Sequence, residues 1–343
     1  MKKFFGVIGN PPYQDQTVGT QKNYGAPIYD KFLDSSFEVS EKVELVHPAR
    51  FLFDAGGTSK NWNRKMLADE HFSILHYEPD GKKMFPSAEI KGGIAISYRD
   101  AGRTIGPIGV FIPDEELRSI HEKTVKAAND ANVAQIMCNR GECHISETFQ
   151  KDYPDWREQV GDTRFMPAMF SRFPDAFFDE EPDDEHEYTY MLGLIRNKRF
   201  WKYVRRDYIR DTSNRIDSYK VFMPNANGNG VFGETISGPL VSGPGTAPTE
   251  SFVSAGPFDS EEDAGRFLKY LKTKFFRALL GIMKKTHHNP AKVFTCIPLQ
   301  DFTSISDIDW SKPIAEIDQQ LYAKYGLDAD EIEFIESHVK EMS

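Results

Sequence analysis

Short apolar runs alternate with amphipathic stretches along the first 105 residues of the chain. The apolar runs predict strands over residues 4–8, 43–46, 73–78 and 92–98. Helical spacing of apolar side chains predicts a helix over 27–39, and the group Trp62, Met66 and Leu67 predicts another ahead of the third strand. Because the first strand is apolar without alternation, we expect it to be parallel and buried.

The pattern becomes irregular after residue 105, where Pro107 and Pro113 interrupt it. A helix is predicted over 114–129, with Asp114 as its cap, and a longer amphipathic helix over 266–285. At the end of the chain we expect one helix that stops at Gly326 and a second that begins with a capping box at Asp328. These changes predict three regions, which are residues 1–105, 106–302 and a helical tail over 303–343.

Composition limits the class of protein. A chain of 343 residues has room for about two domains. It has no apolar run near the roughly 18 residues that span a bilayer, and Gly-Asn-Pro-Pro follows the first apolar residues too soon for a signal peptide. Three cysteines cannot build a disulfide framework, so we expect a cytoplasmic protein without a membrane partner. A net charge of −10 means that any contact with nucleic acid needs a local basic patch.

A zinc site is suggested by Cys138, Cys143 and His144, which lie close together in the sequence. Structural zinc is usually held by four ligands, and the sequence offers no second cysteine pair to complete the set. Ordinary buried thiols are therefore the favoured interpretation, and no metal is expected.

The stretch Asn10-Pro11-Pro12-Tyr13 directly follows the first predicted strand. Neither proline can donate to a strand ladder, so the chain leaves the sheet as a stiff loop, at the edge where α/β sheets bind ligands. The Asn10 amide oxygen and the Pro11 carbonyl are two acceptors, which suit an amino group with two hydrogens. Tyr13 adds a flat face for stacking on a heterocycle. The alternative is a plain strand-to-turn corner, since Asn-Pro also marks turns.

This stretch resembles the N-P-P-Y signature of S-adenosylmethionine-dependent amino-methyltransferases, chiefly the adenine-N6 DNA methyltransferases of restriction–modification systems. The resemblance implies that the catalytic residues are Asn10, Pro11, Pro12 and Tyr13, with Tyr13 stacked on a flipped-out adenine. It also implies an α/β fold, in which the C-terminal half of a Rossmann-like methyltransferase sheet precedes an α+β target-recognition domain. Double-stranded DNA is the implied partner, and S-adenosylmethionine is the implied cofactor.

Further segments resemble the same family. Residues 47–57 look like the strand and loop that follow the catalytic motif, and residues 85–94 look like the next motif, in which a Phe packs on the extruded base. The resemblance implies that Phe85 faces Tyr13 across the adenine. Core packing is the alternative for Phe85, because most aromatic side chains are buried. Weaker matches to the target-recognition region lie at 221–228, 284–289 and 297–303.

The methyl-donor site is the missing part of this resemblance. Such enzymes bind the donor at a Gly-rich turn between a strand and a helix. The Gly-rich pieces of this chain, at residues 55–58, 227–230 and 242–245, do not follow an apolar strand and open a helix. We therefore expect an incomplete S-adenosylmethionine site. The chain would then be a fragment, a degenerate relic, or one subunit completed by a second polypeptide.

Two basic stretches are candidates for a DNA surface. Between residues 196 and 215 there are eight Lys or Arg residues against two carboxylates, with aromatic residues interleaved. A second stretch follows the predicted helix over 266–285 and ends in Thr286-His287-His288-Asn289. Basic groups neutralise phosphates, although a run of charges is more often a solvated face. The predicted DNA contacts are Arg196, Lys198, Arg199, Lys202, Arg205, Arg206, Arg210, Lys284, Lys285, His287, His288 and Asn289.

The leading interpretation is thus an adenine-N6 DNA methyltransferase, or the catalytic-loop and target-recognition part of one. A second interpretation is a DNA-recognition module that binds without methylating. A third is a methyltransferase with the same loop that acts on a protein glutamine or on RNA. The long basic and aromatic middle of the chain speaks against the third interpretation.

Overall fold

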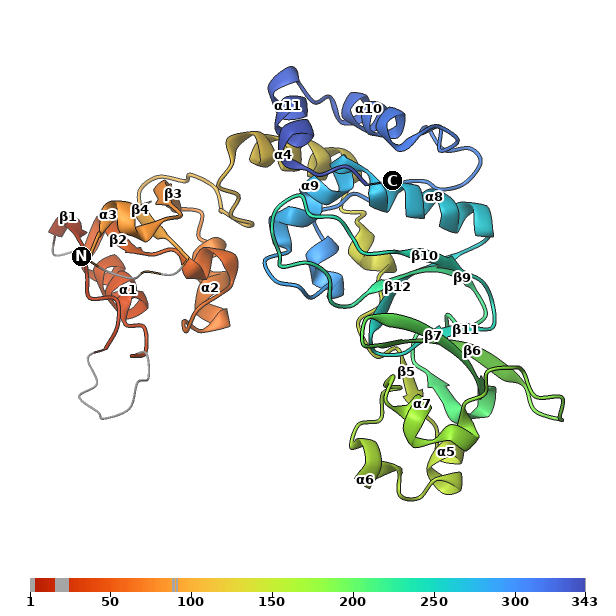
Figure 1. The fold of residues 1–343 in the computed structure, drawn as a ribbon. Coiled ribbons are helices and arrows are strands. Elements are labelled where there is room, and N and C mark those ends of the chain that lie inside the picture. Colours follow the sequence, from red (N-terminus) through yellow and green to blue (C-terminus); the bar gives the residue numbers. More distant parts are fainter. Residues whose placement is uncertain (1–3, 16–24, 88–89, 91, 343) are drawn as a thin grey trace. The chain divides into compact units, whose positions relative to one another are not determined.

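The chain divides into two compact units, Met1–Pro113 and Asp114–Ser343. The computed structural model describes residues 4–15, 25–87, 90 and 92–342, and Figure 1 labels their helices and strands. Among these residues, no helix is both long enough and apolar enough to cross a membrane.

A four-stranded sheet forms the centre of the first unit, in the order β1-β2-β4-β3. Its strands are β1 (Phe4–Gly9), β2 (Ser40–Pro48), β3 (Phe72–Glu78) and β4 (Ile94–Asp100). β1 is parallel to β2, whereas β4 runs antiparallel to both β2 and β3. It follows that β1, β2 and β3 all end at the same edge of the sheet. The four predicted strands are confirmed, with shifted or longer bounds.

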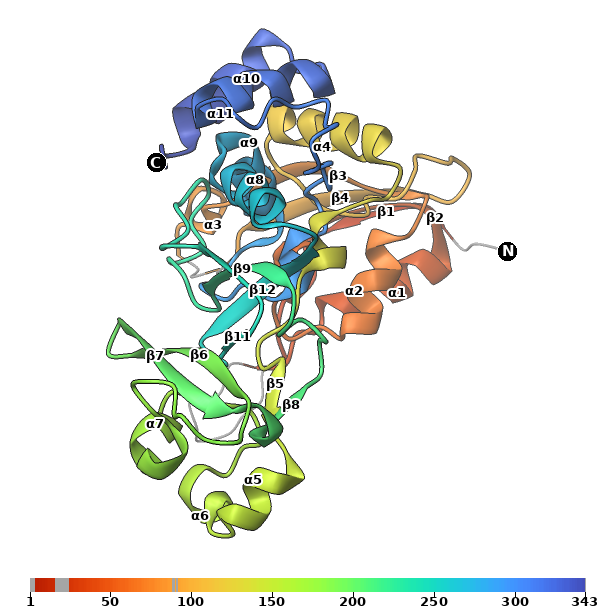
Figure 2. The same ribbon diagram turned by 90° about the vertical axis from the view of Figure 1, so that its right-hand side faces the viewer.

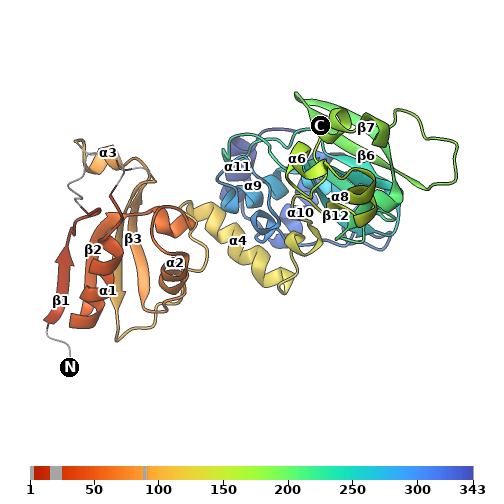
Figure 3. The same ribbon diagram turned by 90° about the horizontal axis from the view of Figure 1, so that it is seen from below.

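Two helices cover one face of this sheet, as Figure 3 shows. They are α1 (Tyr29–Val39) and α2 (Lys60–Leu67), and both were predicted. Their side chains join those of β2, β3 and β4 in a core that includes Leu33, Leu45, Phe51, Trp62, Met66 and Phe72. A 3-10 turn (Arg50–Phe53) follows β2, and the single-turn helix α3 (Gly81–Met84) follows β3.

The expectation that the first strand is buried is wrong. β1 is parallel to its neighbour as predicted, but it lies at the outer edge of the sheet (Figure 3). Phe4, Phe5 and Ile8 are 58%, 78% and 83% exposed. An exposed apolar strand at the edge of a sheet is a template for pairing with a further strand.

The second unit contains a layer of helices. They are α4 (Glu115–Ala128), α8 (Glu261–Lys272), α9 (Lys274–Met283), α10 (Ile314–Tyr325) and α11 (Ala329–His338), and Figure 2 shows them gathered on one side of this unit. Asp114 lies at the N-cap position of α4, but its side chain makes no capping hydrogen bond. Gly326 ends α10 with a φ of 62°, and the capping box of Asp328 and Glu331 opens α11, as predicted. The tail packs on α4, α8 and α9, so it belongs to this unit.

The single long helix predicted over 266–285 is instead two helices that meet at Thr273. Thr273 has an extended backbone (φ −60°, ψ 151°), and its hydroxyl accepts a hydrogen bond from the Phe276 N–H. A threonine that caps a new helix competes with continuation of the old one, which is why the apolar periodicity alone did not reveal the break.

Three small sheets complete the second unit, with the orders β10-β9-β12, β11-β6-β7 and β5-β8. Short helices α5 to α7 pack with β6 and β7 around a core that includes Phe149, Phe165, Met191 and Val204. The strands are β5 (Cys143–Ile145), β6 (Tyr188–Ile195), β7 (Lys198–Arg205), β8 (Ile209–Asp211), β9 (Tyr219–Pro224), β10 (Leu240–Ser242), β11 (Thr246–Pro248) and β12 (Phe252–Phe258). The short helices are α5 (Glu147–Asp152), α6 (Trp156–Val160) and α7 (Met169–Arg172), with 3-10 turns at Val133–Ile136, Pro174–Ala176, Arg206–Tyr208 and Ala291–Phe294.

Candidate functional site

The loop after β1 lies at the edge where the three codirectional strands end. β1 stops at Gly9, and Asn10 and the two prolines then continue without regular structure. The chain is held again at Tyr13, whose carbonyl accepts a hydrogen bond from the Ile28 N–H at 3.1 Å. Asn10 is exposed, so its amide is open to a ligand.

Phe85 also lies near this edge, although it follows β3, the strand farthest from β1 in the sheet. After β3 ends, the Asp80 carboxylate caps the α3 turn by accepting from the Lys82 N–H. The Phe85 N–H donates to the Gly81 carbonyl at 2.8 Å and ends the turn. This hydrogen bond fixes the position of the Phe85 backbone, from which the ring extends. Phe85 is half-buried rather than part of the core.

The rings of Tyr13 and Phe85 meet, although they are far apart in the sequence. Their centroids are 6.4 Å apart and their planes are inclined by 79°, so the contact is edge to face. A flat base held between two rings would need their faces to be parallel. The rings are thus brought together as the resemblance implies, but they touch each other directly, and one of them must turn to admit a base.

The Tyr13 hydroxyl is a notable polar group in this contact. Its oxygen is buried, and it has no hydrogen-bond partner of normal geometry among the described residues. Burial raises the pKa of Tyr13 to about 12, against a smaller lowering by hydrogen bonding with the Asn10 side chain. The Asn10 side chain is the polar group that lies beside this hydroxyl, so two of the residues of the stretch are neighbours at the site.

A buried histidine supports this edge from inside the sheet. His47 lies near the end of β2, and its Nε2 is 2.7 Å from the Ser97 hydroxyl on β4. Its ring stacks on Tyr29 of α1, with centroids 5.9 Å apart and planes inclined by 6°. Burial lowers the pKa of His47 to about 4, so the ring is neutral at pH 7. These contacts give His47 a structural role.

The described residues of the first unit do not fit an S-adenosylmethionine site. β1 runs into Asn10, and β3 runs into the α3 turn, so neither strand opens a helix through a Gly-rich turn. The pair Gly56-Gly57 precedes α2, but other residues of the chain pack against both glycines and leave no room for a ligand there. A Cβ on Gly57 would lie 2.9 Å from Pro27, and one on Gly56 would lie 3.2 Å from the Arg50 side chain.

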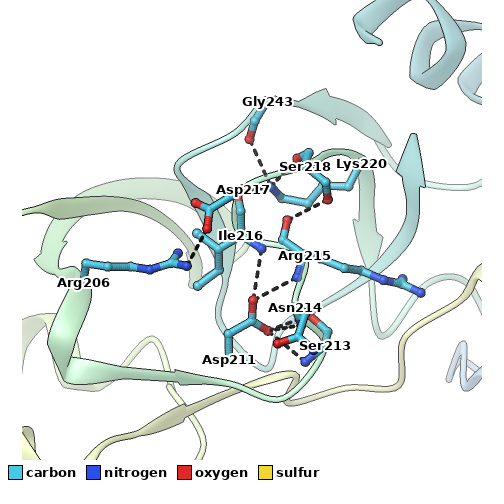
Figure 4. Close-up of polar contacts among 10 residues, drawn as sticks. All are labelled: Arg206, Asp211, Ser213, Asn214, Arg215, Ile216, Asp217, Ser218, Lys220 and Gly243. Atoms are coloured by element: carbon cyan, nitrogen blue, oxygen red, sulfur yellow. Dashed lines mark hydrogen bonds and ion pairs between the residues drawn. The ribbon is translucent and has the colours of Figure 1, made fainter. Parts of the chain in front are cut away.

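The predicted DNA contacts of the first basic stretch lie mostly on a hairpin of β6 and β7, and they fall into two groups. The cations in its stem are paired with carboxylates, as Lys202 is with Asp179 and Arg205 with Asp207. Arg206 pairs with Asp217 at 2.8 Å, which Figure 4 shows. Among the described residues, no ion pair neutralises Arg196, Lys198 or Arg210, and all three are exposed.

The segment after this hairpin is tied down internally (Figure 4). The Asp211 carboxylate accepts hydrogen bonds from successive backbone N–H groups of Ser213, Asn214, Arg215 and Ile216. The Lys220 ammonium is buried, and it donates to the carbonyls of Ile216, Ser218 and Gly243 at 2.9–3.0 Å. Burial lowers the pKa of Lys220 to about 8. These charges hold the segment together and are not open to a phosphate.

The burial of Lys284 and Asn289 corrects the predicted surface. Lys284 is 3% exposed, and its ammonium holds the Asn227 carbonyl at 2.8 Å and the Glu234 carboxylate. Asn289 is 1% exposed and donates to the Pro224 carbonyl at 2.9 Å. A buried group whose donors are already used cannot reach a DNA phosphate. The Lys285 ammonium donates to the Gly281 carbonyl in the last turn of α9, whereas His287 and His288 are exposed.

A loop over residues 225–238 connects the two predicted basic regions. On one side, the Arg199 guanidinium donates to the carbonyls of Ser237 and Gly238. On the other side, the Asn227 N–H donates to the His287 carbonyl at 2.7 Å. The hairpin turn and the exposed histidines therefore border the same loop, although the sequence separates them widely.

Three further cations of the second basic stretch are used within the fold. Lys269 donates to the carbonyl of Trp310 at 2.7 Å, and Lys274 pairs with Glu336 of α11. Arg277 is 2% exposed, since it lies inside the layer of helices. Of the thiols considered for zinc, Cys143 is buried and Cys138 is half-buried, and burial raises the pKa of both.

An exposed amide, a stiff loop and two aromatic rings at the end of codirectional strands define an α/β site suited to a flat, amino-bearing ring. Residues 1–85 match the family model of the Eco57I restriction-modification methylases. The resemblance predicted from the Asn10–Tyr13 stretch is therefore confirmed for this part of the chain.

One curated relative is an uncharacterized adenine-specific methylase of Mycoplasma pneumoniae, which is 31% identical over 94 residues. The match covers 27% of this chain and 22% of the relative, so the chain spans about a fifth of the relative's length. Two solved structures are similar at 11% identity. The type IIG restriction endonuclease BpuSI has a TM-score of 0.32 over 88% of this chain and 45% of its own. The type IIL restriction-modification enzyme MmeI, solved in complex with DNA, has a TM-score of 0.37 over 97% and 56%.

Proposed function

We propose that this chain is the target-base and DNA-binding part of an adenine-N6 DNA methyltransferase from a restriction–modification system. The observation that carries the proposal is the meeting of Tyr13 and Phe85 beside Asn10, at the edge where β1 and β3 both end. The match of residues 1–85 to a restriction-modification methylase family supports it. Such an enzyme acts on DNA in the cytoplasm, where we expect the protein to reside.

In this proposal the chain holds the amino group of a flipped-out adenine. The Asn10 amide oxygen and the Pro11 carbonyl accept its two hydrogens, and Pro12 keeps this pair of acceptors rigid. Accepting both hydrogens leaves the nitrogen lone pair directed away from the loop and free to be methylated. Tyr13 stacks on the base, and Phe85 closes the other face after its ring turns.

The methyl donor would be S-adenosylmethionine, and the described residues of the first unit do not supply its site. We propose that the strands of that site pair with the outer edge of β1, where the side chains of Phe5 and Ile8 are exposed. A further segment of the same polypeptide or a second polypeptide would provide them. The alternative is a DNA-binding module that does not methylate, and the lack of a fitting donor site among the described residues of the first unit favours it.

A donor-independent experiment tests the site. Extruding an adenine from a duplex costs a few kcal/mol, and this cost is absent when the adenine is already unpaired. We therefore expect the chain to bind a duplex with a single bulged adenine about tenfold tighter than a fully paired duplex. Asn10→Ala and Tyr13→Ala should remove this preference, whereas Asn61→Ala, at an exposed position on α2, should keep it.

A second measurement can exclude the module that binds DNA without methylating it. Titration with labelled S-adenosylmethionine should show no tight binding to the chain alone, and tight binding would exclude the module without a donor site. Equal affinity of the chain for bulged and paired duplexes would contradict the base-holding role. Methyl transfer to protein or RNA, without any to duplex DNA, would revive the third interpretation.

A further inference from the structure

The hairpin of β6 and β7 is a continuous two-stranded ribbon. Its residues pair without a break from Tyr188 opposite Arg205 to Ile195 opposite Lys198. Residues 188–206 contain six Lys or Arg residues and no Asp or Glu. The ribbon is therefore strongly positive before its surroundings are considered.

The half of the hairpin nearest the turn has no third strand beside it in the described part of the chain. β11 pairs with β6 only at Tyr190, Met191 and Leu192. On the other side, Phe178 bridges to Tyr203 of β7. From residue 193 to residue 200 the ribbon is two strands wide, but Leu194 and Ile195 pack on the cores of this unit, so the exposed part is the turn and its flanks over 196–200. A two-stranded ribbon fits the major groove of B-DNA, which is about 12 Å wide.

The turn has an unusual sequence for its conformation. Arg196 and Asn197 connect the strands with φ angles of 48° and 61°. Two positive φ angles define the tight hairpin turn in which Asn-Gly is strongly preferred. Arginine is uncommon at such a φ, and residues held in unfavourable conformations concentrate at functional sites.

Charge pairing leaves the turn positive and the stem nearly neutral. Lys202, Arg205 and Arg206 in the stem and at its end each face a carboxylate. Arg196 and Lys198 are exposed, and no described carboxylate pairs with them. Arg199 beside them is anchored, because it donates to Gly238 and lies over the Phe252 ring at 5.6 Å. The turn thus carries two exposed cations without a described carboxylate partner, Arg196 and Lys198, and the anchored Arg199 holds it in place.

We propose that this turn enters the major groove of duplex DNA and reads base edges through Arg196 and Asn197, while Lys198 contacts a phosphate. Arginine pairs with guanine in two hydrogen bonds and asparagine with adenine, so both side chains suit base readout. The inference rests on the DNA partner of the proposed function. It goes further by assigning sequence reading to one turn and by excluding the paired cations of the stem.

The test uses the full chain and a pool of duplexes with a randomised centre. The double variant Arg196→Asn, Asn197→Gly places the preferred Asn-Gly sequence in the turn, so the hairpin should fold at least as well. We expect it to bind about tenfold or more weakly and to lose the sequences that the parent chain enriches. Lys198→Gln should keep the enriched sequences and reduce the slope of log affinity against log salt by about 1. Arg206→Gln, a matched loss of a paired charge, should change neither.

Each outcome decides the inference. Unchanged enrichment and affinity in the turn variants would overturn it and leave the DNA partner intact. A uniform loss of affinity with the same enriched sequences would overturn base reading by the turn. A parent chain that binds no duplex would remove the DNA partner itself, which distinguishes failure of the proposed function. Thermal unfolding of every variant shows that a loss of binding is not a loss of fold.

Discussion

Lys284 offers a sharp test of what the basic residues do. The sequence predicts a phosphate contact, whereas the structure places its ammonium inside the fold, bound to Asn227, Thr286 and Glu234. Lys284→Met keeps most of the apolar stem of the side chain and removes the charge. Glu234, which is 14% exposed, then loses the cation that it faces.

The cost follows from this burial. Removing one partner of a buried pair costs about 3–5 kcal/mol, because the other charge stays buried without its counterion. Glu234 keeps hydrogen bonds from the N–H groups of Asn229 and Gly230, so the lower end of that range applies. For a unit of this size 1 kcal/mol corresponds to about 2–4 °C, which gives a fall in Tm of about 6–12 °C.

The assay is unfolding by urea and by heat, with a double-mutant cycle as control. Glu234→Gln in the Lys284→Met background removes the stranded charge, so the double variant should be less destabilised than the two single losses added together. A Lys284→Met chain with parental stability and weakened DNA binding would refute the structural role. Lys198→Gln should show the opposite behaviour, with weaker DNA binding and unchanged stability.

Two pH dependences of opposite sign are expected. His47 has a folded pKa of about 4 against 6.5 unfolded, so its contribution is complete above pH 6.5, and about 3 kcal/mol is lost as the pH falls to 4. His47→Gln should remove this slope from urea unfolding. Burial raises the pKa of Asp318 to about 6, and hydrogen bonds from the Lys274 and Phe275 N–H groups oppose this rise. The free energy of unfolding of the second unit should therefore fall by about 3 kcal/mol as the pH rises from 3.8 to 6. Asp318→Asn should flatten that fall, and an unchanged profile in either variant would contradict the assignment.

The local elements were predictable where the sequence carries a complete local signal. The capping box from Asp328 to Glu331 is a motif of adjacent residues, and it forms as expected. The strands of the first unit were predictable because each apolar run ends at proline, glycine or charged residues. The loop at Asn10 was predictable for the same reason, since two prolines must end a strand.

Features that depend on distant partners were not predictable. The apolar run of β1 indicates burial only if another strand or layer covers it, and its sequence cannot say which side is open. The hairpin of β6 and β7 was missed because Arg196-Asn197 is a weak turn signal compared with Asn-Gly. The break at Thr273 was missed because the apolar periodicity continues across both helices.

The basic residues show the same limit most clearly. Arg196 and Arg206 are the same residue type in one basic stretch, and composition gives no reason to separate them. The fold separates them, because a loop brings Asp217 back to Arg206, whereas Arg196 lies in the tight turn and pairs with no described carboxylate. The salt dependence of DNA binding reports cations that are unpaired before binding. Arg196 should therefore contribute to the salt slope, whereas the paired Arg206 should not. Changing Arg205 and Arg206, which the sequence alone would select, should therefore affect DNA binding less than changing Arg196 and Lys198.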